Sequence, residues 1–417
     1  MVVQKVILHN LTVPFLPPGT DIFNFDQNGV LFAETGDIVI TRLPIAGAYL
    51  SFLSECGWNF DQTMFLNPPQ EIPRVTTSIF ADLQLMRQIK AVPKDKPQVL
   101  DTFISTRHEQ EWASKLGILY EAKQDQLSFG NKSFFRSLAQ KYAFPLAKGF
   151  IYQKNILGAT IAASSLFMRG FSEIVVKHNS GAAAVGSRRF TLNKLLRSFD
   201  DFEQCISSPL ISDLSQKWED NTFVIEGWCD RVVASPSMQY YIDMTGAATC
   251  VSLHLQLFYA DSMKYKGCLS EHWIGGQLQK RLRSEGQRFS SILAKLGYRG
   301  HVGYNTILLD DGRILWTEIN PRRVMSSYPF QLYQRLFNGR SVSTRYRSEQ
   351  FTRPSWKGKS IDTVLQELKP ILFDKNQGRG IIPFSYELLH SQGRLSLVAF
   401  GATSQEVESF FDHVDHI

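Results

Sequence analysis

Two short apolar runs, 302–309 and 313–319, flank the polar turn Asp310-Asp311-Gly312. Apolar runs joined by Asp-Gly are a strong local signal for a β-hairpin. The second run ends in Glu318 and Asn320, and residues two apart in a strand point to the same face of a sheet. Carboxylate and amide oxygens are ligands that suit Mg²⁺. The pattern therefore predicts a hairpin whose end carries oxygen ligands for a metal.

The first 130 residues alternate between strand-like apolar runs and helix-like amphipathic stretches. The expected strands span 5–11, 37–41, 63–66 and 98–103, and the expected helices span 46–55, 83–91 and 108–116. Strands that alternate with helices indicate a parallel sheet. No Gly-x-Gly-x-x-Gly sequence follows any of these strands. The pattern thus predicts an α/β domain without a dinucleotide site.

From residue 131 onward the pattern predicts longer helices and grouped strands. The expected helices span 131–142, 156–170, 192–206, 275–296, 329–337, 361–372 and 404–414. Besides the hairpin, the expected strands span 172–177, 222–226, 238–244, 249–259, 380–385 and 395–402. Asn131 is the expected N-cap of the first of these helices. The basic, turn-rich segment 340–359 is either a solvated face or a binding surface for an acidic substrate.

Composition narrows the class of protein. The chain has 417 residues, which suits two to three domains, and its hydrophobic content of 43% is ordinary for a globular protein. The net charge, 45 − 39 = +6, is too mild to predict nucleic-acid binding. Five cysteines without a Cys-x-x-Cys pair favour a reduced, cytoplasmic protein. Neither a signal peptide nor a run of about 20 apolar residues is visible, so no membrane partner is expected.

Two further stretches carry candidate chemistry. Lys177 ends a strand-like run and precedes the small-residue segment 180–186, whose backbone N–H groups can surround phosphates. An ordinary strand end followed by a β-turn is the alternative. The strand 222–226 ends in Glu226, with Trp228 close behind, and can present backbone groups and an aromatic wall to a purine. A buried strand edge is the alternative here.

These stretches, in this order and spacing, resemble the ATP-grasp superfamily of ATP-dependent carboxylate–amine ligases over about residues 131–323. The family motif Glu-x-Asn-Pro-Arg stands here as Glu318-Ile319-Asn320-Pro321-Arg322. The resemblance implies that Glu318 and Asn320 hold Mg²⁺ on the phosphates of ATP. The implied catalytic residues are Arg322, Arg323 and Lys177, and the implied nucleotide-binding residues are Lys132, Lys177, Ser180, Gly181, Gly186, Glu226, Gly227, Trp228 and Asp230.

One position departs from the family pattern. Family members usually carry Asp or Glu thirteen residues before the motif Glu, and Asn305 stands there in this chain. Its amide oxygen can still coordinate a metal, so Asn305 is the third expected ligand, but it brings one negative charge fewer. The number of metal ions, one or two, stays open at this point.

The regions on either side of the motifs are similar to peptide ligases of the pheganomycin type, which carry a pre-ATP-grasp domain. The stretches that carry this similarity are 36–41, 235–239, 380–383 and 393–401. The resemblance implies an α/β (α+β) protein in three parts. These are a pre-ATP-grasp α/β domain at 1–130, a nucleotide-binding lobe at 131–229, and a C-terminal lobe with the metal site at 230–417.

The activity implied by the resemblance is ATP-dependent activation of a carboxylate as an acyl phosphate, followed by amide or peptide bond formation with an amine. The alternative is a catalytically impaired ATP-grasp protein that binds nucleotide or acts in regulation, and Asn305 is its main support. The expected partners are small-molecule acids and amines such as amino acids or peptides. A homodimer through the leading domain is allowed by analogy. A loop that excludes water is expected at 180–186 or 259–276.

Overall fold

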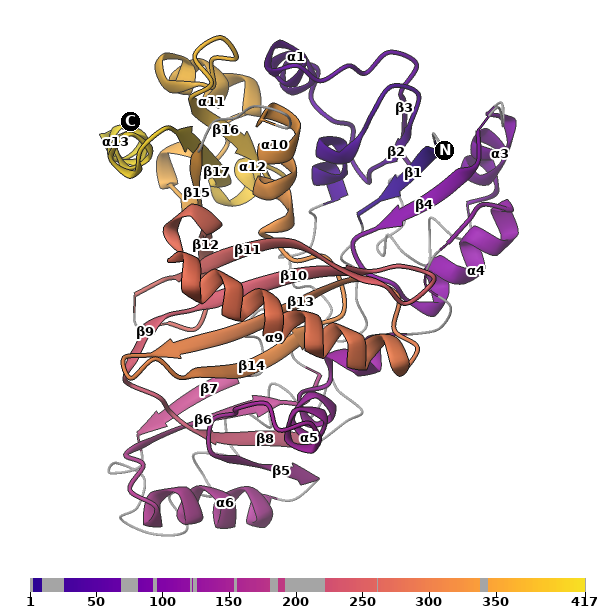
Figure 1. Cartoon of the computed structure of the whole chain (residues 1–417). Helices are drawn as coiled ribbons and strands as arrows, with labels where there is room; N and C mark the ends of the chain where they lie inside the picture. The colour runs from indigo at the N-terminus through magenta and orange to yellow at the C-terminus, as the bar shows by residue number, and fades with distance from the viewer. Residues whose placement is uncertain are drawn as a thin grey trace.

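The computed structural model describes most of the chain (Figure 1). The described residues are 3–9, 26–68, 82–92, 96–120, 122, 126–153, 156–180, 187–191, 222–260, 262–337 and 344–416. The helix expected at 192–206 and the loop glycines Gly181 and Gly186 lie outside these ranges. Within them the strands form three sheets, here called the N-terminal sheet, the small-lobe sheet and the large sheet.

The N-terminal sheet is parallel, with the strand order β3-β2-β1-β4. Its strands are β1 (Gln4–Leu8), β2 (Ile38–Ile40), β3 (Met64–Leu66) and β4 (Gln98–Thr102). The described helices of this region are the 3-10 helix η2 (Asp26–Phe32), α1 (Gly47–Cys56), α3 (Leu83–Ala91) and α4 (Arg107–Leu116). A capping box between Thr106 and Glu109 starts α4. The parallel α/β arrangement predicted from the alternating pattern is confirmed.

The small-lobe sheet is antiparallel, with the order β5-β8-β6-β7. Its strands are β5 (Gly149–Gln153), β6 (Glu173–His178), β7 (Ser187–Thr191) and β8 (Thr222–Gly227). The helix α6 (Ile156–Met168) packs on this sheet, and its Leu166 joins Ile174 and Ile225 in one apolar cluster. The helix α5 (Lys132–Lys141) leads into the lobe.

The large sheet is antiparallel, with the order β14-β13-β10-β11-β12-β15-β17-β16, and β9 (Val232–Ala234) pairs with β13. Its other strands are β10 (Pro236–Ile242), β11 (Ala248–Phe258), β12 (Tyr265–Ser270), β13 (Gly300–Leu309), β14 (Ile314–Asn320), β15 (Arg345–Thr352), β16 (Gly380–Phe384) and β17 (Arg394–Gly401). The predicted hairpin is confirmed as β13–β14, with Gly312 at a φ of 81° in its turn. The helix α9 (Gly276–Lys295) crosses one face of the sheet (Figure 1), where Phe289 stacks on Trp316.

Two segments that were expected to be irregular each contain a strand of the large sheet. β12 lies between β11 and β15, so the expectation of a closing loop at 259–276 is wrong for residues 265–270. β15 lies between β12 and β17, so the segment 340–359 is not simply turn-rich. Charged residues of β15 are paired, since Arg347 contacts Glu349 on the same strand and Glu408 near the end of the chain.

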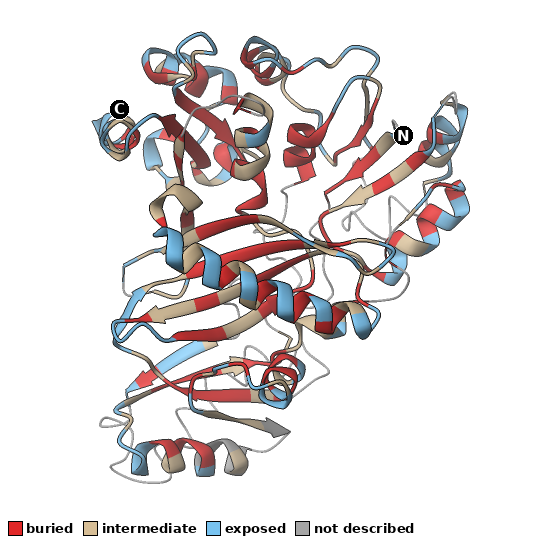
Figure 2. Cartoon of the chain, in the orientation of Figure 1, coloured by how far each residue is buried: buried red, intermediate tan, exposed pale blue. Residues whose placement is uncertain are grey.

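The beginning and the end of the chain share one hydrophobic core. The C-terminal helices in it are α10 (Ser327–Phe337), α11 (Ile361–Leu368), α12 (Leu389–Gln392) and α13 (Ser404–His416). Asn28 and Ser385 exchange two hydrogen bonds, of 2.6 and 2.8 Å, and the Tyr49 hydroxyl donates to the Pro383 carbonyl at 2.8 Å. Figure 2 shows buried residues along the strands and on the inner faces of the helices. None of the helices in the described ranges is long and apolar enough to cross a membrane.

Candidate active site

A cavity of about 1250 Å³ lies between the small-lobe sheet and the large sheet. Its walls include Lys132 from α5, Lys177 from β6, Glu226 from β8 and Glu318 from β14, and it continues along β12, β15 and β17. Small-molecule pockets commonly have volumes of roughly 300–1,000 Å³. This cavity therefore has room for a nucleotide together with a second ligand.

Glu226 forms a buried ionic triad at the small-lobe end of the cavity. Its Oε1 accepts from Arg136 Nη1 at 2.6 Å, and its Oε2 accepts from Lys177 Nζ at 2.6 Å. Only 7% of the Glu226 side chain and 3% of the Arg136 side chain are exposed. Two cations share one carboxylate, so a net positive charge remains, and this charge favours an anionic ligand beside Lys177.

Arg136 is a candidate site residue that the motifs do not identify. It follows Lys132 by four positions on α5, so both side chains lie on the same side of the helix. That spacing is the one signal in the sequence that could have suggested it. The contact between Arg136 and Glu226 joins residues 90 positions apart, and nothing local predicts it.

Asn179 joins the end of β6 to the start of α5. Its carbonyl oxygen accepts from the Lys132 N–H at 3.0 Å, and its Oδ1 accepts from the Ser133 N–H at 2.9 Å. Asn131 occupies the N-cap position as expected, but its side chain makes no capping hydrogen bond. Asn179, which directly follows β6, thus caps the N-terminus of α5. This contact holds Lys132 in the same cavity wall as Lys177.

Lys132 is buried in this wall. Burial lowers the pKa of its ammonium group to about 8, with Lys177 acting in the same direction and the carboxylates of Glu318 and Glu226 opposing. The group therefore changes charge close to neutral pH. An ammonium at this place adds to the positive charge that faces the cavity.

We expect nucleotide affinity to fall as the pH rises through about 8, because Lys132 then loses its charge. The measurement is ADP titration calorimetry between neutral and alkaline pH on the wild type, on Lys132→Met and on the exposed control Lys90→Met. Lys132→Met should lose this pH dependence, whereas the control should keep it. An affinity of the wild type that is unchanged over this range would contradict the assignment.

The same titration has a consequence for stability. The folded pKa of Lys132 lies below its ordinary value of 10.5, so between about 8 and 10.5 the unfolded chain binds the proton that the folded chain has lost. The contribution of Lys132 to the free energy of unfolding therefore rises with pH across this window. Urea unfolding of the wild type and of Lys132→Met over the same pH range measures it.

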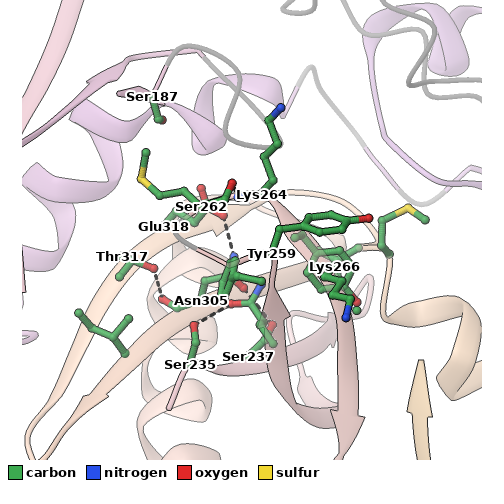
Figure 3. Close-up of a pocket in the computed structure, with 18 of the residues that line it drawn as sticks. Ser187, Ser235, Ser237, Tyr259, Ser262, Lys264, Lys266, Asn305, Thr317 and Glu318 are labelled. Carbon is green, nitrogen blue, oxygen red and sulfur yellow. Dashed lines mark hydrogen bonds between the residues drawn. The ribbon is translucent and has the colours of Figure 1, made fainter. Parts of the chain in front are cut away.

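Glu318, Asn305 and Ser237 stand opposite one another on the adjacent strands β14, β13 and β10 (Figure 3). The Asn305 amide donates to Glu318 Oε1 at 2.6 Å, and the Ser237 hydroxyl donates to Asn305 Oδ1 at 2.9 Å. Asn320 donates to the same Glu318 oxygen at 3.2 Å. The structure thus brings the three expected metal ligands together, with Ser237 as a fourth polar group that the motif does not include.

The charge and number of these oxygen atoms limit the metal that fits. Burial acts to raise the pKa of Glu318, but Lys132, the hydrogen bond from Asn320 and Lys177 lower it overall, so the group is ionised. Within the described ranges, no three His, Cys, Asp or Glu side chains are grouped so that they could hold a metal. The Oδ1 atoms of Asn305 and Asn320 here accept from Ser237 and Arg322, while their amide nitrogens face Glu318. With both amides turned about, one carboxylate and two amide oxygens would fit a single Mg²⁺ that keeps water and phosphate ligands.

The two arginines that follow the motif lie in different places. Arg322 donates to Asn320 Oδ1 at 2.9 Å and lines the cavity, and burial lowers its pKa. Arg323 instead pairs with Asp101 of β4 at 2.8 Å, and its guanidinium lies 4.5 Å from the centre of the Phe32 ring. It lines a smaller cavity of about 210 Å³ beside the N-terminal sheet. The structure therefore brings Arg322, but not Arg323, together with the other candidates.

The segment after β8 lines the cavity with Trp228 and Asp230. The Arg189 guanidinium lies 4.3 Å from the centre of the Trp228 ring. A Cβ on Gly227 would fall 2.3 Å from the Phe171 ring, so this position needs glycine. Ser180 is not among the residues that line the cavity, and the other loop candidates, Gly181 and Gly186, lie outside the described ranges.

No family model matches the sequence, and no curated protein matches it. Solved structures do match over nearly the whole chain. An N5-carboxyaminoimidazole ribonucleotide synthetase in complex with ADP has a TM-score of 0.60 at 12% identity, covering 99% of this chain and 96% of its own. Biotin carboxylase from Campylobacter jejuni has a TM-score of 0.62 at 11% identity, covering 97% and 89%. An L-amino acid ligase from Bacillus licheniformis has a TM-score of 0.54 at 12% identity, covering 100% and 97%. At these identities the likeness concerns the fold alone.

Proposed function

We propose that this chain, which has the ATP-grasp fold, is an ATP-dependent ligase that activates a carboxylate as an acyl phosphate and joins it to an amine. The observation that carries the proposal is the single cavity in which Lys132, Lys177 and Glu318 converge. Phosphoryl transfer depends mainly on positioning and on neutralising phosphoryl charge, and cations facing an ionised carboxylate supply both.

The nucleotide site is assigned to the small-lobe end of the cavity. The backbone of β8 and the ring of Trp228 would hold the adenine, and Lys132 and Lys177 would contact the phosphates. Lys177 is already fixed by its 2.6 Å ion pair with Glu226, which is itself held by Arg136. Little side-chain freedom is therefore lost when the nucleotide binds.

The metal site is assigned to Glu318, Asn320 and Asn305. Mg²⁺ bound there would offset the negative charge of the ATP phosphates. The single ionised carboxylate supports one ion rather than two. Arg322, held by Asn320 in the same wall, would add a fixed positive charge next to the reacting carboxylate.

In the proposed reaction a substrate carboxylate oxygen attacks the γ-phosphorus of ATP, and the bond from that phosphorus to the β-phosphate oxygen breaks. This step gives an acyl phosphate and ADP. The amine nitrogen then attacks the acyl carbon, and phosphate leaves with the electron pair of the broken C–O bond. The amide forms as the nitrogen loses its proton to solvent. Arg322 and Lys177 would hold the charge on the phosphoryl oxygens.

Within the family, the resemblance of the flanking sequences supports a peptide ligase of the pheganomycin type that works on amino acids or peptides in the cytoplasm. We retain the division into 1–130, 131–229 and 230–417, which follows the three sheets. Residues of α1 and η2 pack with the C-terminal helices, so the first and third parts would move together.

The test is release of ADP and phosphate from ATP and Mg²⁺ with a panel of amino acids and dipeptides, alone and in pairs. The proposal requires at least one acid–amine pair that raises release well above the level without substrate. Nucleotide binding without turnover for any pair would instead favour the regulatory alternative, for which Asn305 is the main support.

We expect Asn305→Asp to strengthen Mg²⁺ binding and to lower stability when Mg²⁺ is absent. The new carboxylate would stand where the amide now donates to Glu318 at 2.6 Å, and two like charges that close repel. The measurement is the change in melting temperature on adding MgCl₂. The rise should exceed that of the wild type and that of Asn376→Asp, an exposed control. An equal rise in melting temperature in all three proteins would show that Asn305 is not a metal ligand.

A further inference from the structure

The turn that follows β14 carries Arg322 into the large cavity. It spans residues 321–326, between β14 and α10. The Arg322 guanidinium donates to Asn320 Oδ1 at 2.9 Å and to the Arg323 carbonyl at 3.0 Å. The second of these bonds does not depend on which way the Asn320 amide faces. The position of the guanidinium therefore follows the conformation of the turn. Three further residues of the turn line the cavity, namely Val324, Met325 and Ser326.

Gly303 lets this turn lie directly on the large sheet. In the strand register Gly303 stands between Gln239 of β10 and Asn320 of β14. These three residues lie two positions along their strands from Ser237, Asn305 and Glu318, so the two rows share one face of the sheet. A Cβ on Gly303 would fall 2.7 Å from Val324 Cγ1. The turn therefore crosses the sheet at the one place in this row where a side chain is missing.

The side chain of Gln239 holds the end of the turn. Its Nε2 donates to Ser326 Oγ at 2.9 Å, and its Oε1 accepts from the Ser327 hydroxyl at 2.7 Å. Ser327 Oγ in turn accepts from the Val324 N–H at 3.1 Å. Gln239 is only 5% exposed and is not among the residues that line the cavity. It therefore acts on the turn and not on a ligand.

Buried partners on the other side fix the Gln239 amide. Burial lowers the pKa of His254 to about 3, so its imidazole is neutral. Its Nδ1 lies 3.3 Å from Gln239 Nε2, and its Nε2 lies 2.5 Å from the Tyr346 hydroxyl. A neutral ring that accepts at Nδ1 and donates at Nε2 satisfies both contacts. The Gln239 nitrogen then has two acceptors and its oxygen one donor, and such a connected buried network keeps the side chain in one orientation.

We propose that Gln239 is a positioning residue of the ligase reaction, which holds the turn 321–326 so that the Arg322 guanidinium faces the phosphoryl group. This inference rests on the proposed function, in which Arg322 holds charge on the phosphoryl oxygens. The other end of the turn has a separate anchor, since the Arg323 N–H donates to the Phe103 carbonyl at 2.9 Å. Loss of Gln239 therefore displaces Arg322 without releasing the whole turn.

The test uses Gln239→Leu and the smaller change Ser327→Ala, which remove the two sides of one hydrogen bond. Calorimetry measures the binding of inorganic phosphate to the full-length protein saturated with ADP and Mg²⁺. Both variants should bind phosphate about 10-fold more weakly than the wild type, as expected for a weakened charge-assisted contact. Their affinity for ADP should stay unchanged, because the nucleotide site is assigned to the small-lobe end of the cavity.

The matched control for Ser327→Ala is Ser290→Ala. Ser290 is also buried, and its hydroxyl lies 2.7 Å from the Tyr304 hydroxyl, on the α9 side of the large sheet. This control loses a buried hydrogen bond of the same kind, so its melting temperature should fall by a similar amount. Its affinity for phosphate should equal that of the wild type, because the turn 321–326 is untouched.

A double-mutant cycle separates positioning from general stability. Arg322→Gln alone should weaken phosphate binding at least as much as Gln239→Leu. The double variant should bind phosphate no more weakly than Arg322→Gln, because Gln239 acts through Arg322 and its effect is then already lost. Additive losses in the double variant would overturn the proposal.

Other outcomes distinguish this inference from the proposed function. Unchanged phosphate affinity in both Gln239→Leu and Ser327→Ala would overturn the inference, and so would an equal loss in Ser290→Ala. A wild type that binds ADP but no phosphate would overturn it as well, because Arg322 would then hold no phosphoryl group. A wild type that does not bind ADP would refute the proposed function itself, and this inference with it.

Discussion

Replacing Glu226 with Ala is expected to lower the free energy of unfolding by about 3–5 kcal/mol and to abolish measurable nucleotide binding. The substitution leaves Arg136 and Lys177, whose side chains are 3% and 16% exposed, without the carboxylate that both contact. Two buried cations would then repel each other, and Lys177 would lose the contact that fixes its position. Urea-induced unfolding and ADP titration calorimetry measure the two effects.

The control for this variant is Glu173→Ala in the same lobe. Glu173 pairs with Arg189 on the neighbouring strand, and the two side chains are 22% and 40% exposed, so solvent already screens the pair. Loss of this ion pair should lower the free energy of unfolding by no more than about 1 kcal/mol. If Glu226→Ala were as mild as this control, the triad would not be the element that organises the nucleotide end of the cavity.

Glu318→Gln is expected to reduce turnover by about 10²–10³-fold, because it removes the only ionised group among the three expected metal ligands while nearly preserving its shape. Binding of nucleotide without Mg²⁺ should persist. The carboxylate of Glu318 also raises the pKa of Lys132, so the pH at which ADP affinity falls should move below that of the wild type. Steady-state ADP release and the pH series of ADP titrations test both parts.

A matched control for Glu318→Gln is Asp311→Asn in the turn of the same hairpin. Asp311 pairs with Arg313 at the protein surface and does not line the cavity. This variant should keep normal turnover and the pH dependence of ADP affinity seen in the wild type. Normal turnover in Glu318→Gln itself would show that Glu318 takes no part in the reaction. An unchanged pH dependence of ADP affinity would show that Glu318 does not influence the pKa of Lys132.

The features around the candidate site that the sequence predicts and the structure shows are those set by local pattern. The Asp-Asp-Gly turn and its apolar flanks define the β13–β14 hairpin, and the two-residue period places Glu318 and Asn320 on one face. The ATP-grasp resemblance adds Lys132 and Lys177, which line the same cavity as the hairpin. Each of these expectations depends on residues that are close in the chain or on a motif of fixed spacing.

The parts that the sequence does not predict depend on contacts between distant residues. Arg136 acts through Glu226 on another element, and Arg323 turns away from its neighbour Arg322 because Asp101 of the N-terminal sheet attracts it. β15 lacks an apolar face in its sequence because one of its faces is in the cavity and the other carries ion pairs. Charged strands of this kind resemble solvated loops until their partners are known.

The hydrogen bonds between Asn28 and Ser385 have a consequence during synthesis of the chain. The two residues are 357 positions apart in the chain. Because ribosomes add roughly 5–20 residues per second, Ser385 is synthesised roughly 20–70 s after Asn28. During that time the apolar side chains of η2 and α1 lack the C-terminal half of their core. The nascent chain therefore exposes an aggregation-prone surface until translation is nearly complete. Yield of native protein should consequently depend on chaperones that act on nascent chains, and a chain stalled before α13 should not fold its first domain completely.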